Sequence, residues 1–146
     1  MTLTIRDLRA EDEAEWRALW TGYLEFYETS VPEEVYQTYF QRVLGTDPQD
    51  FHGLVAEKDG VLIGLTHFLF HRHGWLIENT VYLQDLFVSE TARGTGAGRA
   101  LIEAVYERAD AAGCPGVYWM TQEFNATARQ LYDRIATKTP FIMYRR

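Results

Sequence analysis

The stretch LFVSETARGTGAGRALIEAV, residues 86 to 105, constrains the fold more than any other part of the chain. An apolar run leads into three glycines within five positions, Gly94, Gly96 and Gly98, and a helical pattern follows. Glycine admits positive φ and lets a ligand approach the main chain. The first turn of the next helix offers free N–H groups and the positive end of a dipole, which suits phosphate. The stretch therefore predicts a phosphate- or pyrophosphate-binding turn between a strand and a helix.

Two common phosphate-binding patterns do not fit this turn. The dinucleotide pattern G-x-G-x-x-G fails, because Arg99 or Leu101 stands where its third glycine should be. The Walker pattern fails because no Lys-Ser or Lys-Thr follows the glycines. A glycine-rich turn that binds no ligand stays open as an alternative.

The helical patterns are amphipathic. Aromatic and leucine side chains recur at three- and four-residue spacing from Trp16 to Tyr27, and this aromatic stripe is expected to belong to the core. A second helix is expected after the capping-box pattern of residues 30–33. A third starts after the glycines and stops at Gly113, and a fourth covers residues 125–135.

Strand patterns fill most of the remaining chain. The Asp59-Gly60 pair between two apolar runs predicts a β-hairpin. Further strands are expected at residues 3–8, 75–88, 116–121 and 139–146. The order of helices and strands predicts an α/β fold around one mixed sheet.

Composition narrows the location and the partners. The 146 residues, 47% of them hydrophobic, suffice for one domain with one core. A net charge of -7 without a basic stripe argues against nucleic acid as the main partner and favours cationic ligands. Cys114 is the single cysteine, the early charges do not fit a signal peptide, and no apolar run could span a membrane. The cytoplasm is therefore the expected location.

Two motifs carry a resemblance to a known family. The R-x-x-G-x-G run from Arg93 to Gly98, directly after LFV, resembles the acetyl-CoA pyrophosphate loop of the GNAT superfamily of N-acetyltransferases. The segment EFNATARQLYDR resembles that superfamily's N-x-x-A-x-x-L-Y segment, with Asn125, Ala128, Leu131 and Tyr132 in the matching positions. The element order also matches. The resemblance implies a GNAT fold, with residues 1–146 forming a single N-acetyltransferase domain around a central mixed, mostly antiparallel sheet.

The resemblance also implies which residues hold acetyl-CoA and which residue acts on it. Tyr132 would be the general acid that protonates the CoA thiolate, and the N–H of Val88 would be the oxyanion donor. Arg93 and Arg99 could add charge at the pyrophosphate or be solvated, and Asn125 could cap its helix or bind the cofactor. The expected cofactor-binding residues are Leu86, Phe87, Val88, Arg93, Gly94, Thr95, Gly96, Ala97, Gly98, Arg99 and Asn125.

Within the superfamily, the chain looks most similar to polyamine, diamine and histone acetyltransferases. The expected acceptor is the primary amine of a small cationic molecule, polyamine or amino-acid-like. A protein lysine or histone-tail acetyltransferase and a non-catalytic acyl-CoA-binding regulatory module are the alternatives. Several diamine enzymes read Y-L-E-D where this chain has Gln84 in the sequence Y-L-Q-D, which puts polyamine specificity in doubt. A homodimer is expected, because the family often pairs and the terminal FIMY run offers a strand edge.

The expected acceptor-binding residues are Glu25, Tyr27, Glu28, Gln84 and Trp119. Gln84 and Asp85 alternate along one strand, so only one should face a shared cleft, and Gln84 is the favoured one. The general base stays open among Glu25, Glu28, Glu78 and Asp85, acting directly or through water.

Three histidines share one parity along a predicted strand. His67, His71 and His73 could line one face, but no Cys, Asp or Glu completes a zinc site in the sequence. No metal is expected.

Overall fold

The computed structural model describes residues 2–146. Five strands form one sheet in the order β1-β2-β3-β4-β5. Strands β1 to β4 pair antiparallel, and β5 pairs parallel to β4. The expected mixed, mostly antiparallel sheet is therefore confirmed. The strands are β1 (Leu3–Asp7), β2 (His52–Lys58), β3 (Val61–His71), β4 (Thr80–Val88) and β5 (Val117–Tyr118).

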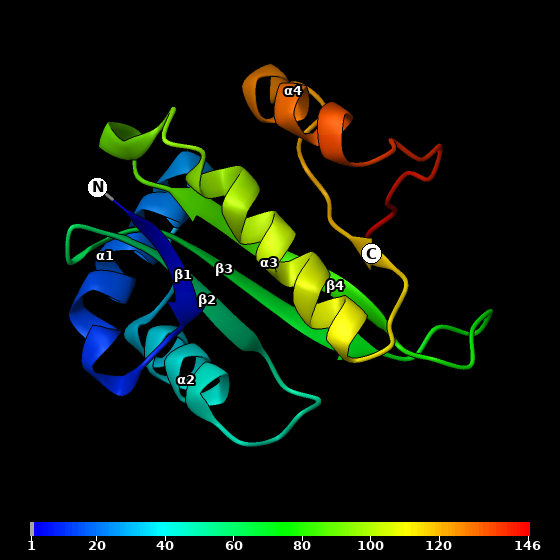
Figure 1. The fold of residues 1–146 in the computed structure, drawn as a ribbon, viewed down its shortest axis with the longest axis horizontal. Helices are drawn as coiled ribbons and strands as arrows, with labels where there is room; N and C mark the ends of the chain where they lie inside the picture. Colours follow the sequence, from blue (N-terminus) through cyan, green and yellow to red (C-terminus); the bar gives the residue numbers. More distant parts are fainter. Residues whose placement is uncertain (1) are drawn as a thin grey trace.

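Helices cover both faces of the sheet (Figure 1). Helices α1 (Glu13–Phe26) and α2 (Glu33–Leu44) share a core with one face, and α3 (Ala97–Ala111) shares a core with the other. Helix α4 (Ala126–Ile135) follows β5, and the chain after it runs back toward β5 (Figure 1). Over residues 2–146, no helix combines the length and the apolar character needed to cross a membrane.

The aromatic stripe of α1 forms the centre of the core between the sheet and the α1–α2 layer. Trp16 is fully buried, and its ring stacks on Trp20 at a centroid distance of 5.6 Å. Tyr39 and Phe40 of α2 pack against the same ring. The expectation that this stripe belongs to the core is confirmed for Trp16 and Trp20, whereas Tyr23 and Tyr27 at its end are half-buried.

The hairpin between β2 and β3 is also confirmed. Asp59 and Gly60 have φ angles of 53° and 78°. Two successive positive φ angles are what a two-residue type I′ turn needs, and the Asp-Gly pair supplies them at low cost.

One irregularity in the pairing of β3 with β4 shapes the site. His67 lies opposite Asp85, whereas the next residue, Phe68, lies opposite Leu83. Gln84 is therefore the extra residue of a β-bulge, which breaks the simple alternation of side chains along β4.

On its other side, β4 pairs with β5 over only a short length. It pairs with β5 only at Val81 and Tyr82. From residue 83 to residue 88, one edge of β4 is paired with β3, and no strand of the described chain lies along its other edge. This open edge is where an extended ligand could add main-chain hydrogen bonds.

The strand expected at residues 139–146 is wrong. These residues form no regular structure, and Phe141 and Tyr144 are 78% and 89% exposed. The apolar run looks like a strand in the sequence, but β5 is only two residues long and offers it no edge of useful length.

Three other boundaries also differ from the expectations. The strand expected from residue 75 begins at Thr80, and only residues 117–118 of the expected 116–121 pair. Helix α2 has Pro32 as its N-cap and no capping box, because the Glu33 carboxylate instead accepts two hydrogen bonds of 2.8 Å from Arg17.

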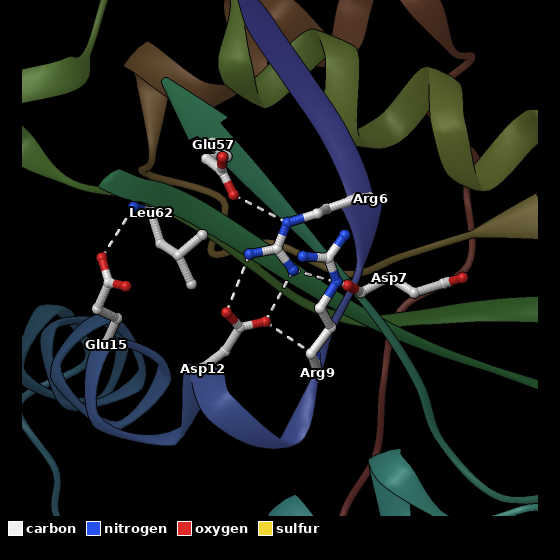
Figure 2. Close-up of polar contacts among 7 residues, drawn as sticks. All are labelled: Arg6, Asp7, Arg9, Asp12, Glu15, Glu57 and Leu62. Atoms are coloured by element: carbon white, nitrogen blue, oxygen red, sulfur yellow. Dashed lines mark hydrogen bonds and ion pairs between the residues drawn. The ribbon is translucent and has the colours of Figure 1, made fainter. Parts of the chain in front are cut away.

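A buried carboxylate, that of Asp12, ties the start of the chain to the sheet. Arg6 of β1 donates two hydrogen bonds to Asp12, at 2.8 and 2.9 Å, and a third to Glu57 (Figure 2). The N–H of Arg9 also donates to Asp12. The hydrogen bonds from Arg6 hold the pKa of Asp12 below its ordinary value. The contribution of this pair to stability is therefore lost as the pH falls through that lowered pKa.

Candidate active site

The glycine turn has the geometry that its sequence predicts. Gly94 and Gly96 have φ angles of 87° and 83°, where other residues are strained. A Cβ at either position would meet no atom within 4 Å, so the surface beside both main chains is open. Gly98 lies in the first turn of α3, close to Val88 and Leu131.

The turn presents a group of free donors. The Thr95 hydroxyl donates to the Ala92 carbonyl at 2.7 Å and accepts from the Ala97 N–H at 3.4 Å, which fixes the turn internally. The N–H groups of Gly94, Gly96, Gly98 and Arg99 have no acceptor within residues 2–146. Free N–H groups at the N-terminus of a 15-residue helix suit a pyrophosphate.

The two arginines of the turn lie in solvent. Arg93 is exposed, and Arg99 forms an exposed ion pair with Glu103 at 3.4 Å. Asn125 caps α4, where its side-chain oxygen accepts from the Ala128 N–H at 3.4 Å.

A pocket opens beside the free edge of β4. Of the residues expected in the site, Tyr27, Gln84, Leu86, Trp119 and Tyr132 line it together. Elements far apart in the sequence thus meet here. The remaining lining residues are Tyr23, Leu83, Asp85, Ile102 and Met120.

Tyr132 holds its proton firmly. Burial raises the pKa of its hydroxyl to about 12, and the nearby Tyr27 adds to the shift. Its ring packs edge-on against Trp119 at a centroid distance of 5.4 Å. A protonated phenol at the wall of the pocket, beside the open strand edge, can serve as a proton donor.

Two of the expected acceptor-binding residues lie outside this pocket. Glu25 and Glu28 are exposed at the end of α1, and neither lines it. Tyr23, one turn before Tyr27 on α1, is a lining residue that the sequence did not identify as part of the site. Its place in the aromatic stripe suggested a core residue. Its spacing of four residues from Tyr27, which puts both side chains on one helix face, was the sequence signal that could have placed it in the site.

The expectation that only one of Gln84 and Asp85 faces the cleft is wrong. Both line the pocket, because the bulge places two successive residues opposite one residue of β3. Gln84 is exposed, whereas Asp85 is 5% exposed. The Asp85 carboxylate accepts from His67 Nδ1, Tyr39 and Trp20, so it is not free to act as a base.

The three histidines do not converge. His67 is buried and bound to Asp85, and His71 Nε2 lies 2.7 Å from the Tyr118 hydroxyl. His73 accepts from the Trp75 N–H. Within the described residues, no three His, Cys, Asp or Glu side chains are grouped to hold a metal ion.

Comparison with known proteins agrees with this geometry. Residues 16–136 match the family model described as the acetyltransferase (GNAT) family. Over 145 residues the chain is 39% identical to a D-amino-acid N-acetyltransferase of Saccharomyces cerevisiae, covering 99% of this chain and 90% of the yeast protein. It is 28% identical to an L-ornithine N5-acetyltransferase of Arabidopsis thaliana over 120 residues, which are 81% of this chain and 47% of that one.

Solved structures show the same fold. The aminoglycoside N-acetyltransferase AAC(6′)-Iy in complex with CoA superposes with a TM-score of 0.84, at 21% identity, covering 99% of this chain and 94% of that one. The family match spans most of the chain, and the yeast relative aligns along almost all of it. The protein therefore belongs to the GNAT family of acetyltransferases, enzymes that use acetyl-CoA.

Proposed function

We propose that the protein transfers the acetyl group of acetyl-CoA to the primary amine of a small, amino-acid-like acceptor. The observation that carries this proposal is the convergence of three elements. A Cβ on Gly98 would lie 3.7 Å from both Val88, at the end of β4, and Leu131, the neighbour of Tyr132 on α4. The glycine turn, the open strand edge and the proton donor are therefore adjacent.

Different residues are assigned to cofactor binding, oxyanion stabilisation and proton donation. The free N–H groups from Gly94 to Arg99 hold the pyrophosphate, and the main chain of residues 86–88 pairs with the pantetheine arm like an added strand. The N–H of Val88 stabilises the developing oxyanion. Tyr132 gives its proton to the departing thiolate, which becomes the thiol of CoA.

The acceptor amine must lose a proton to become nucleophilic. The only carboxylate among the residues that line the pocket is Asp85, which three donors already occupy. Glu78 lies exposed in the connection between β3 and β4. We therefore propose that water in the open pocket takes up the proton that the acceptor amine loses. The amine then attacks in its neutral form.

An amino-acid-like acceptor is favoured over a polyamine. The relative that is 39% identical to the chain acts on D-amino acids, and a second relative acts on ornithine. Gln84 is neutral where diamine enzymes of similar sequence carry a carboxylate, which removes one attraction for a second ammonium group.

A panel of amines tests the acceptor. Release of free CoA thiol should be measured with D- and L-amino acids, ornithine, polyamines, aminoglycosides and histone peptides at matched concentrations. We expect the highest kcat/KM with a free amino acid. A highest value with histone peptides would instead identify a protein acetyltransferase, and no turnover with any amine would indicate a binding module.

A homodimer is part of the proposal. The exposed run from Phe141 to Tyr144 has no strand partner within residues 2–146, and β5 ends the described sheet with an unpaired edge. A second copy can cover both features at once, because two chains can exchange their terminal runs. The cytoplasm is the proposed location, since a chain with one cysteine needs no oxidising compartment.

Light scattering tests the dimer. At micromolar concentration we expect twice the 16.9 kDa mass of the chain, and a variant lacking residues 140–146 should be monomeric. A parent that stays monomeric with and without acetyl-CoA would refute the dimer and leave the enzyme proposal intact.

A further inference from the structure

A buried hydrogen-bond cluster surrounds the carboxylate of Asp85. His67 Nδ1 donates to Oδ1, while the Tyr39 hydroxyl and Trp20 Nε1 donate to Oδ2 at 3.0 and 3.3 Å. Trp16 Nε1 donates to His67 Nε2 at 2.9 Å. These five residues are called the Asp85 cluster, and each of them is less than 9% exposed.

The donors fix the charge of this cluster. Because Trp16 donates to Nε2 of His67, that nitrogen carries no proton, and the ring proton sits on Nδ1, where it points at Asp85. His67 is therefore neutral and Asp85 is anionic. Burial, reinforced by the negative charge of Asp85, raises the pKa of Tyr39 well above its ordinary value, so Tyr39 stays a donor.

The cluster holds β4 at its bulge. Asp85 directly follows Gln84, the extra residue, and directly precedes Leu86, where the cofactor-facing main chain begins. The hydroxyl of buried Thr66 donates to the Asp85 carbonyl at 2.8 Å, so the residue is held at its side chain and at its main chain. The side-chain donors come from α1, α2 and β3, so three elements hold this one residue of β4.

This arrangement selects one register of the strand. If β4 slipped by one residue, Gln84 or Leu86 would face the donors of His67, Tyr39 and Trp20. Leu86 would leave all of those buried donors without an acceptor, and the Gln84 amide would satisfy only part of them. The bulged register alone presents an anion to the donors.

We propose that the Asp85 cluster is a positioning device for acetyl-CoA, in which Asp85 and His67 set the β4 bulge and thereby the main chain of residues 86–88. The inference rests on the proposed function, because the role of that main chain belongs to it. Asp85 and His67 are positioning residues, which act on the cofactor through the strand.

The test is the affinity for free CoA, measured by calorimetry on folded protein. We expect Asp85→Asn to weaken CoA binding by at least about tenfold, because its amide nitrogen cannot accept from donors that the carboxylate satisfied. The matched control is Asp12→Asn, which changes a carboxylate of the same burial at the start of the chain. It should lower the melting temperature and leave CoA affinity within about twofold, since it touches neither β4 nor the turn.

His67 supplies a second comparison, with a conservative rescue. Gln at position 67 keeps one N–H donor and one acceptor, whereas Leu keeps neither. We expect His67→Gln to bind CoA within about twofold of the parent and His67→Leu to lose at least about tenfold. If Asp85→Asn does not fold, Tyr39→Phe replaces it, since it removes one donor and keeps the ring; its CoA affinity should fall about threefold.

The outcomes separate the two proposals. The positioning role would be overturned if folded Asp85→Asn and His67→Leu both bound CoA with near-parental affinity. Tyr39→Phe takes the place of Asp85→Asn in this comparison if Asp85→Asn does not fold. This result would leave the proposed function standing. A parent protein that does not bind CoA at all would overturn the proposed function, and the positioning role with it.

Discussion

Tyr132→Phe is expected to lower the single-turnover rate of acetyl transfer by about 10²–10⁴-fold, the usual contribution of general acid catalysis. The variant keeps the ring that packs on Trp119 and removes only the hydroxyl. Acetyl-CoA affinity should stay nearly constant, because the residues proposed to hold the pyrophosphate and the pantetheine arm do not include Tyr132. Single-turnover rates are needed because slow product release could mask a change in chemistry at steady state.

The stability of this variant should hardly change. Within residues 2–146 the Tyr132 hydroxyl makes no hydrogen bond to the protein, so Phe leaves no buried group unsatisfied. Tyr106→Phe is the matched control, since the Tyr106 hydroxyl donates to the Ile135 carbonyl at 3.0 Å. The control should lose about 1 kcal/mol of unfolding free energy and keep its turnover.

The pKa of Tyr132 gives a second readout on the parent enzyme. Because that pKa is raised to about 12, the hydroxyl stays protonated through the neutral and mildly alkaline range. The parent rate should therefore rise with pH as the acceptor amine becomes neutral, without a falling limb from Tyr132 below that pKa.

A Tyr132→Phe single-turnover rate within about twofold of the parent would show that Tyr132 is not the acid.

Gly96→Glu is expected to weaken acetyl-CoA binding by at least about tenfold, or roughly 1.4 kcal/mol. The new side chain would place a Cβ and a carboxylate in the open space beside the free N–H groups, which is the proposed site of the pyrophosphate. Calorimetry on folded protein measures this directly. The φ of 83° at Gly96 adds backbone strain to any substitution.

Gly60→Glu separates strain from ligand exclusion. Gly60 has a φ of 78° in the β2–β3 turn, and a Cβ there also meets nothing within 4 Å. Both variants should lose similar stability, whereas only Gly96→Glu should lose affinity. Equal acetyl-CoA affinity in the two folded variants would show that the pyrophosphate lies elsewhere.

The sequence predicted the parts of the site that depend on local chemistry. The glycines at 94 and 96 take the positive φ angles expected of them, and Asn125 caps α4 as its position suggested. Such features depend on a few neighbouring residues, so a short motif specifies them.

Features that depend on residues far apart in the sequence were harder to predict from it. The bulge at Gln84 follows from donors in α1, α2 and β3, so strict alternation misplaced Asp85. His67 sat in a pattern of three histidines and gave no sign of its partner on β4. The terminal run has the residues of a strand, but the strand beside it, β5, is only two residues long and offers no edge of useful length.

Transfer of an acetyl group from CoA to an amine can be followed directly with a labelled donor. The parent protein should be mixed with acetyl-CoA labelled in its acetyl group and with a free amino acid. The acetylated amino acid and the CoA thiol should then be quantified together over time. We expect one labelled acetyl-amino acid for each thiol released, at a rate that depends on the amine and falls in Tyr132→Phe. Thiol release that matches a protein-free control, with no label on any amine of the panel, would contradict this expectation.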